Sequence, residues 1–306
     1  MVKQGRSMKT ATHQDYQTRL LRVLAHIRAH LDEQLPLETL AEVACLSPFH
    51  FHRIFTGMLG EPVSALVRRL RLERAAWQLN TSATPIIEIA LDAGYDSHEA
   101  FSRTFRQFFA CSPSGFRSRQ APRPVIKSVS GIHFNPQSQP ESIPLMSHPT
   151  EYELTTNIQT LSPLRVACIR KQGPYEECGP AWDKLLGLLG PEGHLGPGTQ
   201  MIGIGYDDPD NTPPDQIRYD AAVTIDDDFQ AFDEIQIHEI PGGRYAVTTH
   251  EGPYDQLRSV YRAIFGTWLP QSGHEVADAP CFEIYLNDPS STDPKDLLTD
   301  IYLPLA

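Results

Sequence analysis

The segment Ser47-Pro-Phe-His-Phe-His-Arg-Ile-Phe-Thr-Gly57 predicts a helix with clear signals at both ends. Ser47 suits an N-cap and Pro48 suits the first helical position. Gly57 and Gly60 are typical of the end of a helix. One face is apolar and would anchor the helix in a core, whereas the outward face carries Phe49, His50, His52, Arg53 and Thr56. Such a helix is either an ordinary amphipathic surface helix or a recognition helix that lies in a groove.

The same pattern occurs again fifty positions later, in residues 97–105. The segments before the two helices, residues 40–46 and 89–95, also match each other at an offset of 49. Each copy therefore reads as a short apolar helix, a turn and a capped helix, which is the pattern of a helix-turn-helix motif. The matched pairs in the capped helices are Ser47 with Ser97, Phe51 with Phe101, Arg53 with Arg103, and Phe55 with Phe105.

Residues 17–119 resemble the AraC/XylS family of transcription regulators. The resemblance lies in Leu46-Ser47, Arg53-Ile54-Phe55, Gly60, residues 67–76, Ile89-Ala90, Gly94-Tyr95, residues 101–105 and residues 112–117. It implies double-stranded DNA as a partner, read by one helix of each motif. The expected DNA-binding residues are Phe49, His50, His52 and Arg53 in the first motif and His98, Ser102 and Arg103 in the second. Because Glu99 departs from the family pattern and would repel phosphate, the target sequence of relatives does not transfer.

The charge of the chain is divided unevenly along its length. Residues 1–127 contain 17 Lys and Arg against 11 Asp and Glu, whereas residues 128–306 contain 9 against 27. The overall net charge of −12 thus hides a basic first part. Only that part is suited to approach phosphate, so we expect a DNA-binding domain joined to a domain with another task.

Length and composition predict about two domains of an ordinary globular protein, with 306 residues of which 40% are apolar. Residues 1–15 read as a loose polar tail without a signal peptide, and no apolar run is long enough for a membrane span. The five cysteines show no Cys-x-x-Cys spacing, which argues against a disulfide framework and a structural zinc site. We therefore expect a reducing cytoplasm, no cofactor and no metal.

The DNA-binding domain is expected to span residues 16–121. A first helix is predicted over 16–31, and Pro36 begins the next element. A longer helix over 63–79 would connect the two motifs and hold their recognition helices about one turn of DNA apart, ~34 Å. Its four arginines are either a solvated face or phosphate contacts: Arg68, Arg69, Arg71 and Arg74. Residues 122–150 contain six prolines and predict an extended linker, partly ordered near 125–134.

A second internal repeat fills residues 151–306. Residues 165–175 match residues 244–254 at an offset of 79, and each copy is an alternating strand that ends in Gly-Pro-Tyr. A helix follows in each, then strands over 201–206 and 280–285, and over 217–225 and 295–303 with one residue slipped. The chain is thus predicted to be multidomain, with an all-α N-terminal domain that holds two helix-turn-helix motifs. Its C-terminal domain would be α+β, built from two pseudo-symmetric ββαββ-like repeats with a cleft between the halves.

This second half resembles the GyrI-like ligand-binding domain, through the paired Gly-Pro-Tyr turns and Phe282-Glu283-Ile284-Tyr285. In that family a glutamate at this strand position meets lipophilic cations, which points to Glu283. The repeat aligns Glu283 with the apolar Ile204, and a carboxylate at an inward position is costly unless it is paired or has a purpose. A salt bridge to Arg258 or Arg262 is the alternative. The aromatic residues that could cage a cation, or simply fill the core, are Tyr175, Trp182, Tyr206, Tyr254, Tyr261, Trp268 and Tyr285.

The sequence therefore predicts a transcription regulator that senses a small, lipophilic or cationic effector in an acidic aromatic pocket, with no catalytic residues. Expected partners are DNA and the effector, with RNA polymerase as a further candidate and no membrane. A monomer could engage both DNA contacts, and a dimer stays open. The alternative is a hydrolase of small electrophilic compounds, with Glu283 and a tyrosine positioning a water. A pure protein-interaction module is the third class.

Overall fold

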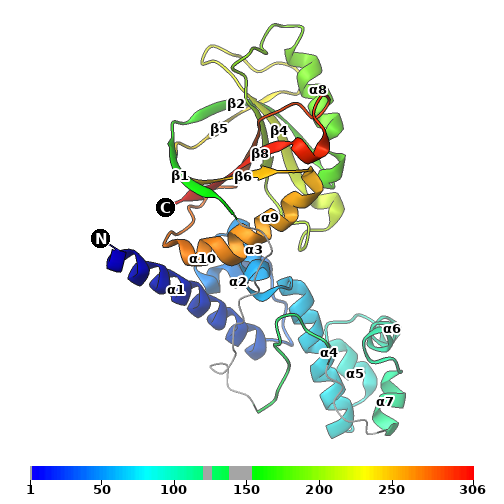
Figure 1. Cartoon of the computed structure of the whole chain (residues 1–306). Coiled ribbons are helices and arrows are strands. Elements are labelled where there is room, and N and C mark those ends of the chain that lie inside the picture. Colours follow the sequence, from blue (N-terminus) through cyan, green and yellow to red (C-terminus); the bar gives the residue numbers. More distant parts are fainter. Residues whose placement is uncertain (1, 120–125, 138–153) are drawn as a thin grey trace. The chain divides into compact units, whose positions relative to one another are not determined.

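The computed structural model describes residues 2–119, 126–137 and 154–306 (Figure 1). The chain forms two compact units, one of residues 14–148 and the other of residues 1–13 and 149–306. The first unit is helical, and the second is an antiparallel sheet with helices. The expected two-domain architecture is confirmed. Among the described helices, none has both the length and the apolar character needed to cross a bilayer.

The helical unit contains two helix-turn-helix motifs joined by a long helix. Its elements are α1 (Val2–Ala29), α2 (Leu37–Ala44), α3 (Pro48–Leu59), α4 (Val63–Thr81), α5 (Ile86–Asp92), α6 (His98–Phe109) and α7 (Pro113–Arg119). The pairs α2 with α3 and α5 with α6 are the two motifs, and α4 connects them. The expected loose tail over residues 1–15 is wrong from Val2 onward, because α1 begins there. The sequence pattern predicted a helix only over 16–31. It did not predict the helical conformation of residues 2–15, because a polar segment can extend a helix that packing has already nucleated.

The two motifs are capped differently despite their matching sequences. The Ser97 hydroxyl accepts a hydrogen bond from the Ala100 amide at 3.1 Å, as an N-cap should. Within the described part of the chain, the Ser47 side chain accepts no such bond at the start of α3. At the other end, Gly60 is the C-cap with φ 76°, whereas Gly57 lies inside α3 and does not end it.

Each motif has its own aromatic core. Phe51, Ile54 and Phe55 of α3 are fully buried, as the helical spacing predicts. In the second motif Phe101 and Phe105 pack with Phe116 of α7 and with the apolar face of the second half of α4. Helix α4 therefore belongs to both motifs, so its length and rigidity position one motif with respect to the other.

The arginines of α4 are mostly structural. Arg71 donates to the carbonyl oxygens of Leu31 at 2.8 Å and Glu33 at 2.5 Å, which follow α1. Arg74 donates to the carbonyl oxygen of Asp92 at 2.6 Å, at the end of α5. Only Arg68 of the four is exposed. Of the two interpretations left open by the sequence, a phosphate-facing arginine cluster thus fits Arg68, while Arg71 and Arg74 tie neighbouring elements to α4.

Buried Arg69 fixes the segment after the helical domain. Its guanidinium pairs with Glu61 at 2.6 Å and Glu73 at 3.2 Å, and donates to the carbonyl oxygen of Ile132 at 2.6 Å. Glu73 also accepts from the Phe134 amide at 2.6 Å. The expectation of order near 125–134 is therefore confirmed for residues 126–134. The rest of the expected linker, 122–125 and 138–150, lies outside the described residues.

The second unit is one eight-stranded antiparallel sheet with the order β1-β6-β8-β7-β3-β4-β2-β5. The strands are β1 (Thr156–Leu161), β2 (Leu164–Gln172), β3 (Met201–Gly205), β4 (Arg218–Thr224), β5 (Gln236–Ile240), β6 (Gly243–Glu251), β7 (Phe282–Tyr285) and β8 (Leu298–Leu305). Helix α8 (Gly179–Leu189) follows β2, and α9 (Leu257–Ala263) follows β6. A π-helical segment, η5 (Ile264–Trp268), continues α9 into α10 (Leu269–Ser272). The two predicted ββαββ repeats are thus present.

The two repeats exchange their first strands. Strand β1 of the first repeat pairs with β6 of the second, and β5 of the second pairs with β2 of the first. Strands β3 and β7 meet at the centre, where Gly203 lies opposite Glu283. A pseudo-twofold axis therefore passes between these two strands.

The later strands are related by an offset of 80, whereas the predicted offsets were 79 for residues 201–206 with 280–285 and 78 for residues 217–225 with 295–303. The amides of Gly173 and Gly252 bond to the carbonyl oxygens of Ile217 and Leu297, respectively, at 2.8 and 2.9 Å. Likewise Gly205 pairs with Tyr219, and Tyr285 pairs with Thr299. Glu283 is thus equivalent to Gly203, and its predicted alignment with Ile204 is wrong. One extra residue before β7 explains the change of offset from 79 to 80. The match between β2 and β6 does not reveal it, because the extra residue comes later in the chain.

The sheet has two unlike faces. The helix-covered face carries Gly203, Tyr219, Glu283 and Tyr285, and α8 and α9 both reach it through hydrogen bonds from Trp182 and Tyr261. The opposite face has a core of its own, made of Val166, Cys168, Ile202, Ile204, Ala222, Ile240, Tyr245, Val247, Phe282, Ile284 and Tyr302. Alternation along each strand decides which residues lie on which face.

Candidate nucleic-acid interface and ligand site

Helix α6 presents the second set of predicted DNA-binding residues. His98 and Arg103 are exposed and Ser102 is half-buried, while Phe101 and Phe105 hold the opposite side of the helix in the core. The Ser97 cap fixes the start of the helix beside His98. This division leaves a polar, basic face that is free to meet a groove.

Helix α3 differs from this expectation. His50 and His52 are buried, with 1% and 3% of their surface exposed, although the helical spacing predicted an outward position for both. Phe49 and Arg53 are half-buried. The spacing of apolar residues shows which face enters the core of a motif, but it does not show what covers the other face. Phe49 and Arg53 are therefore the more accessible candidates in the first motif.

Glu283 lies at the centre of a hydrogen-bonded aromatic cluster on the helix-covered face. Its Oε1 accepts from the Tyr261 hydroxyl at 3.0 Å, and its Oε2 accepts from the Tyr285 hydroxyl at 2.8 Å. Tyr285 lies two residues along β7, and Tyr261 comes from α9. The half-buried carboxylate is thus held between a strand and a helix by two phenol groups.

The hydrogen bonds beyond Glu283 run in one direction. Tyr285 has a single hydroxyl proton, which it donates to Glu283, so in the 3.1 Å contact between the Tyr219 and Tyr285 hydroxyls Tyr219 is the donor. Trp182 Nε1 in turn donates to the Tyr219 hydroxyl at 3.0 Å. Three donors in series therefore point toward one carboxylate, and each polarises the next.

The tyrosine hydroxyls around Glu283 stay protonated at neutral pH. Burial raises the pKa of Tyr285 well above its usual range, and the charge of Glu283 raises it further. Burial also raises the pKa of Tyr219. Tyr254, whose ring meets that of Tyr285 at 5.3 Å, has its pKa raised by burial and then by Glu283. The negative charge of the cluster thus belongs to Glu283 and not to a phenolate.

Gly203 makes room for this arrangement. A Cβ atom at Gly203 would collide with the Tyr285 hydroxyl and lie 2.7 Å from the Tyr219 hydroxyl. Because Gly203 is directly opposite Glu283 on the neighbouring strand, its missing side chain is the space that the two hydroxyls occupy.

Most of the predicted aromatic residues meet in this cluster. Trp182 contacts the Tyr285 ring at 5.8 Å. Tyr175 contacts Tyr219 at 6.0 Å, but its hydroxyl donates to the Asp207 carbonyl oxygen at 2.6 Å, which makes it a structural member. Tyr254 is 37% exposed and forms the open side of the cluster.

One predicted member and one predicted alternative are wrong. Tyr206 lies on the opposite face of the sheet, where its hydroxyl donates to Asp220 at 2.8 Å. Trp268, a further predicted member, stacks on His274 at 6.4 Å. Arg258 and Arg262 both pair with Asp210. The first error follows from the offset of 79, since a slip of one residue moves a strand side chain to the other face.

Two members of the site were not predicted, Tyr219 and Gly203. Tyr219 joins Trp182 to Tyr285, and it is almost fully buried. The signal that could have found it is the alternation of β4, which places Tyr219 on the same face as Ala221 and Val223. Gly203 has no signal in a single sequence, because its role depends on what lies above it.

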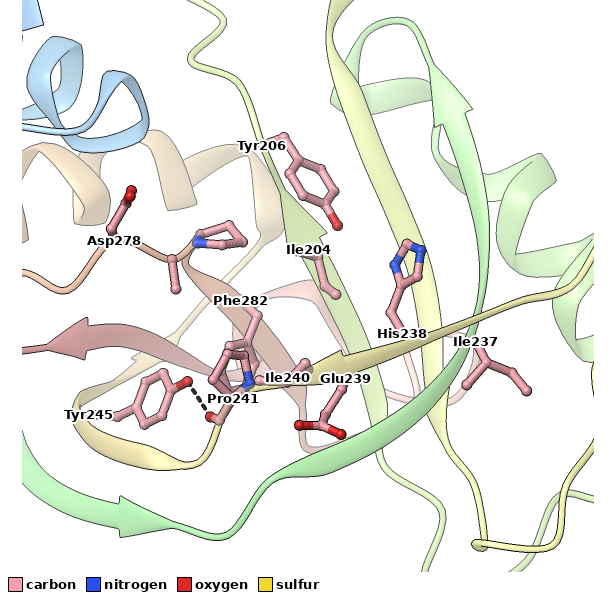
Figure 2. A pocket seen from close by; sticks show the side chains of 12 residues that line it. Ile204, Tyr206, Ile237, His238, Glu239, Ile240, Pro241, Tyr245, Asp278 and Phe282 are labelled. Atoms are coloured by element: carbon pink, nitrogen blue, oxygen red, sulfur yellow. Dashed lines mark hydrogen bonds between the residues drawn. The ribbon is translucent and has the colours of Figure 1, made fainter.

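A cavity of about 500 Å³ lies on the opposite face of the sheet (Figure 2). Tyr206, His238, Tyr245 and Phe282 are among its lining residues, and the Tyr245 hydroxyl donates to the carbonyl oxygen of Pro241 at 2.7 Å. This cavity is separate from the Glu283 cluster, since the sheet lies between them.

Buried polar groups lie beside this cavity. Asp220 is fully buried and forms a two-point ion pair with Arg170, at 2.7 and 2.8 Å. Cys168 is also fully buried, and burial followed by the charge of Asp220 raises the pKa of its thiol to about 12. Cys168 is therefore a protonated thiol at neutral pH, like an ordinary buried cysteine.

Comparisons with known proteins agree with both units. Residues 154–306 match the GyrI-like small molecule binding domain, and residues 40–119 match a helix-turn-helix domain. A DNA gyrase inhibitor from Yersinia enterocolitica is 31% identical over 130 residues, which are 41% of this chain and 82% of that protein. The regulatory protein SoxS of Escherichia coli is 35% identical over 97 residues, 32% of this chain and 91% of that protein.

A third relative, the right origin-binding protein of Escherichia coli, is 36% identical over 95 residues, 31% of this chain and 33% of that protein. The fold and these similarities together define a DNA-binding transcription regulator with a small-molecule-binding domain. The chain belongs to the GyrI-like family, whose signature covers half of it, and it joins that domain to an AraC-type helix-turn-helix domain.

Proposed function

We propose that this regulator senses a lipophilic cation through Glu283. The observation that carries the proposal is the half-buried carboxylate held by the hydroxyls of Tyr261 and Tyr285 and surrounded by aromatic rings. A carboxylate in such surroundings favours a positive partner, because the phenols orient it without neutralising its charge. The rings of Trp182 and Tyr254 could add face contacts worth ~0.5 to 2 kcal/mol each.

For the DNA side, we propose that α6 reads bases with His98, Ser102 and Arg103, and that α3 contributes Phe49 and Arg53. Arginine can bond to O6 and N7 of guanine in the major groove, which discriminates bases by ~1 to 3 kcal/mol. The exposure of Arg103 supports its role. The accessible surface of α3 supports fewer DNA-binding residues than the sequence predicted, because His50 and His52 are buried.

The test of the sensing role is the variant Glu283→Gln. It preserves the shape and the acceptor oxygen but removes the charge, so we expect weaker binding of lipophilic cations by at least ~1 kcal/mol. Neutral ligands of the same shape should lose little. Calorimetric titration of matched cationic and neutral ligands against both proteins measures the difference. Equal losses for the two ligand types would mean that Glu283 serves the fold and not the charge preference.

Two further variants locate the ligand. Asp278→Asn removes the charge of a residue that lines the cavity on the opposite face, and cation binding should be unchanged in it. Tyr261→Phe removes one hydrogen bond to Glu283 but keeps the charge and the ring, and it should retain the preference for cations. Loss of cation binding in Asp278→Asn alone would move the ligand to the other cavity.

The same incubation tests the hydrolase alternative. A sensor returns its ligand unchanged, whereas a hydrolase converts it, and mass spectrometry of the recovered ligand distinguishes the two. Both oxygens of Glu283 already accept phenol protons, which suits a binding group better than a base that must accept a proton from water. DNA binding measured with and without the cation then shows whether occupancy is transmitted.

A further inference from the structure

Three side chains that can bind a metal come together from three neighbouring strands. Cys168 lies on β2, Asp220 on β4 and His238 on β5, and β2 pairs with the other two strands on its two sides. All three lie on the opposite face of the sheet from Glu283. Cys168 and Asp220 are fully buried, and His238 lines the cavity of that face (Figure 2).

The spacing of their donor atoms fits a single ion. Cys168 Sγ is 3.4 Å from His238 Nδ1, and His238 Nδ1 is 3.3 Å from Asp220 Oδ2. The three donor atoms all lie within 4.8 Å of one another. Around tetrahedral zinc, bond lengths of about 2.3 Å to sulfur and about 2.0 Å to nitrogen and oxygen give separations of roughly 3.5 and 3.3 Å. The two measured separations are close to these values.

The three donor atoms can be joined by hydrogen bonds as well as by an ion. With a proton on Nδ1, His238 can donate to Asp220 or to the sulfur of Cys168, while the thiol donates to another acceptor. A cation between the three atoms is the alternative arrangement, because each of them can present a lone pair to it.

Asp220 already has strong partners, which a cation would have to share. Arg170 holds both of its oxygens, and the Tyr206 hydroxyl donates to Oδ2. The bond from Arg170 Nε to Oδ1 can hold the carboxylate in place while Oδ2 exchanges one of its partners. Arg170 thus serves as an outer group that orients a ligand, as is common around metal sites.

We propose that Cys168, Asp220 and His238 form a binding site for one zinc-like divalent cation. Sulfur, imidazole and carboxylate donors together favour such an ion over magnesium or calcium. On binding, the thiol of Cys168 loses its proton to solvent and its sulfur forms the bond to the metal. Three protein ligands leave a fourth position for water or for a donor atom of a ligand in the cavity.

The test is a titration of the full-length protein with cobalt(II) alone, followed by absorption. A thiolate bond to cobalt produces a charge-transfer band in the near ultraviolet, and we expect it to saturate at one ion per chain. Cys168→Ala should abolish the band. His238→Gln, at a partly exposed position, should weaken cobalt binding roughly ten-fold or more, since even outer groups of metal sites contribute ten- to hundred-fold. Added zinc should displace the cobalt.

Two controls make the result specific. Cys281→Ala removes another buried thiol of the same unit and should leave the band unchanged. Glu283→Gln should also leave it unchanged, which separates this site from the proposed effector site. A wild-type protein without the band, or a band that persists in both Cys168→Ala and His238→Gln, would overturn the proposal.

Discussion

At the scale of single residues, Gly203 shows how an absent side chain can build a site. The hydroxyls of Tyr219 and Tyr285 occupy the space where its Cβ would be, and from there the Tyr285 hydroxyl donates a hydrogen bond to Glu283. The acidic group is therefore oriented by a residue that has no polar side chain. A substitution at Gly203 should therefore alter this site without any change to the carboxylate itself.

We expect Gly203→Ala to lower the free energy of unfolding by about 1 to 3 kcal/mol, as overpacked positions do. It should also weaken cation binding, because the displaced Tyr285 can no longer hold Glu283. Gly187→Ala is the matched control, since a Cβ at Gly187 in α8 meets nothing within 4 Å. There the better helix propensity of alanine should stabilise the protein by about 0.5 to 1 kcal/mol. Thermal unfolding and calorimetric titration measure both effects, and equal stability changes would contradict the role of Gly203.

The sequence predicted Glu283 and most of its aromatic neighbours, because a charge within an apolar alternating strand stands out. Tyr206 was misplaced, since a repeat aligned with one residue out of step assigns every later strand side chain to the wrong face. The cluster of Cys168, Asp220 and His238 gave no signal at all in the sequence. These residues are 52 and 18 positions apart in the chain, and only the pairing of β2 with β4 and β5 brings them together.

At the scale of elements, α4 is the part that holds the two motifs in one geometry. Arg71 binds the carbonyl groups after α1, and its guanidinium Nη1 lies 2.7 Å from where a Cβ of Gly94 would be. Gly94 has a φ of +81°, in the left-handed region that glycine favours, and it ends the first helix of the second motif. One arginine thus lies against the segment before the first motif and against the turn within the second.

The variant Arg71→Ala tests this role against its exposed neighbour. We expect a loss of about 2 to 3 kcal/mol in the free energy of unfolding, because hydrogen bonds to a charged group are lost and two carbonyl groups lose their donor. Arg68→Ala should change stability by less than about 0.5 kcal/mol. If Arg68 faces a phosphate group, its removal should reduce the slope of log K against log salt concentration by about 1. Denaturant unfolding and salt titrations of DNA binding check the pair, and equal destabilisation would contradict the assignment.

Elements were predicted more completely than their surroundings. Both helix-turn-helix motifs and both sheet repeats follow from patterns that recur within the chain. The burial of His50 and His52 does not, because helical spacing describes one face of α3 and is silent about the other. The same limit applies to residues 2–15, whose polar composition predicted a tail where α1 begins.

At the scale of the whole molecule, charge separates the two activities. The basic part of the chain, residues 1–127, has the excess of Lys and Arg that counterion release requires, and the remainder has three acidic residues for each basic one. A strongly acidic unit that shares a chain with a DNA reader gains no affinity from phosphate. It is therefore free to use its carboxylates for other ligands.

We expect Arg53→Ala and Arg103→Ala each to relax sequence preference, at positions about one helical turn apart, because a single chain carries both readers. Each loss should amount to ~1 to 3 kcal/mol of discrimination where the arginine reads guanine. Binding to sites with single base-pair changes, at a fixed salt concentration, measures it. Changes confined to one position for both variants would show that only one motif engages DNA.

The exchange of first strands in the sheet has a consequence for how the domain can be divided. A protein cut between β4 and β5 would yield two halves that each lack an edge strand. Strand β1 of the first half pairs with β6 of the second, and β5 of the second half pairs with β2 of the first. Each half by itself would leave its first strand unpaired, although the two sequences repeat. Two copies of one half could restore the equivalent strand pairings only by exchanging their first strands. The single chain therefore has the architecture of an intertwined homodimer whose two subunits have been fused.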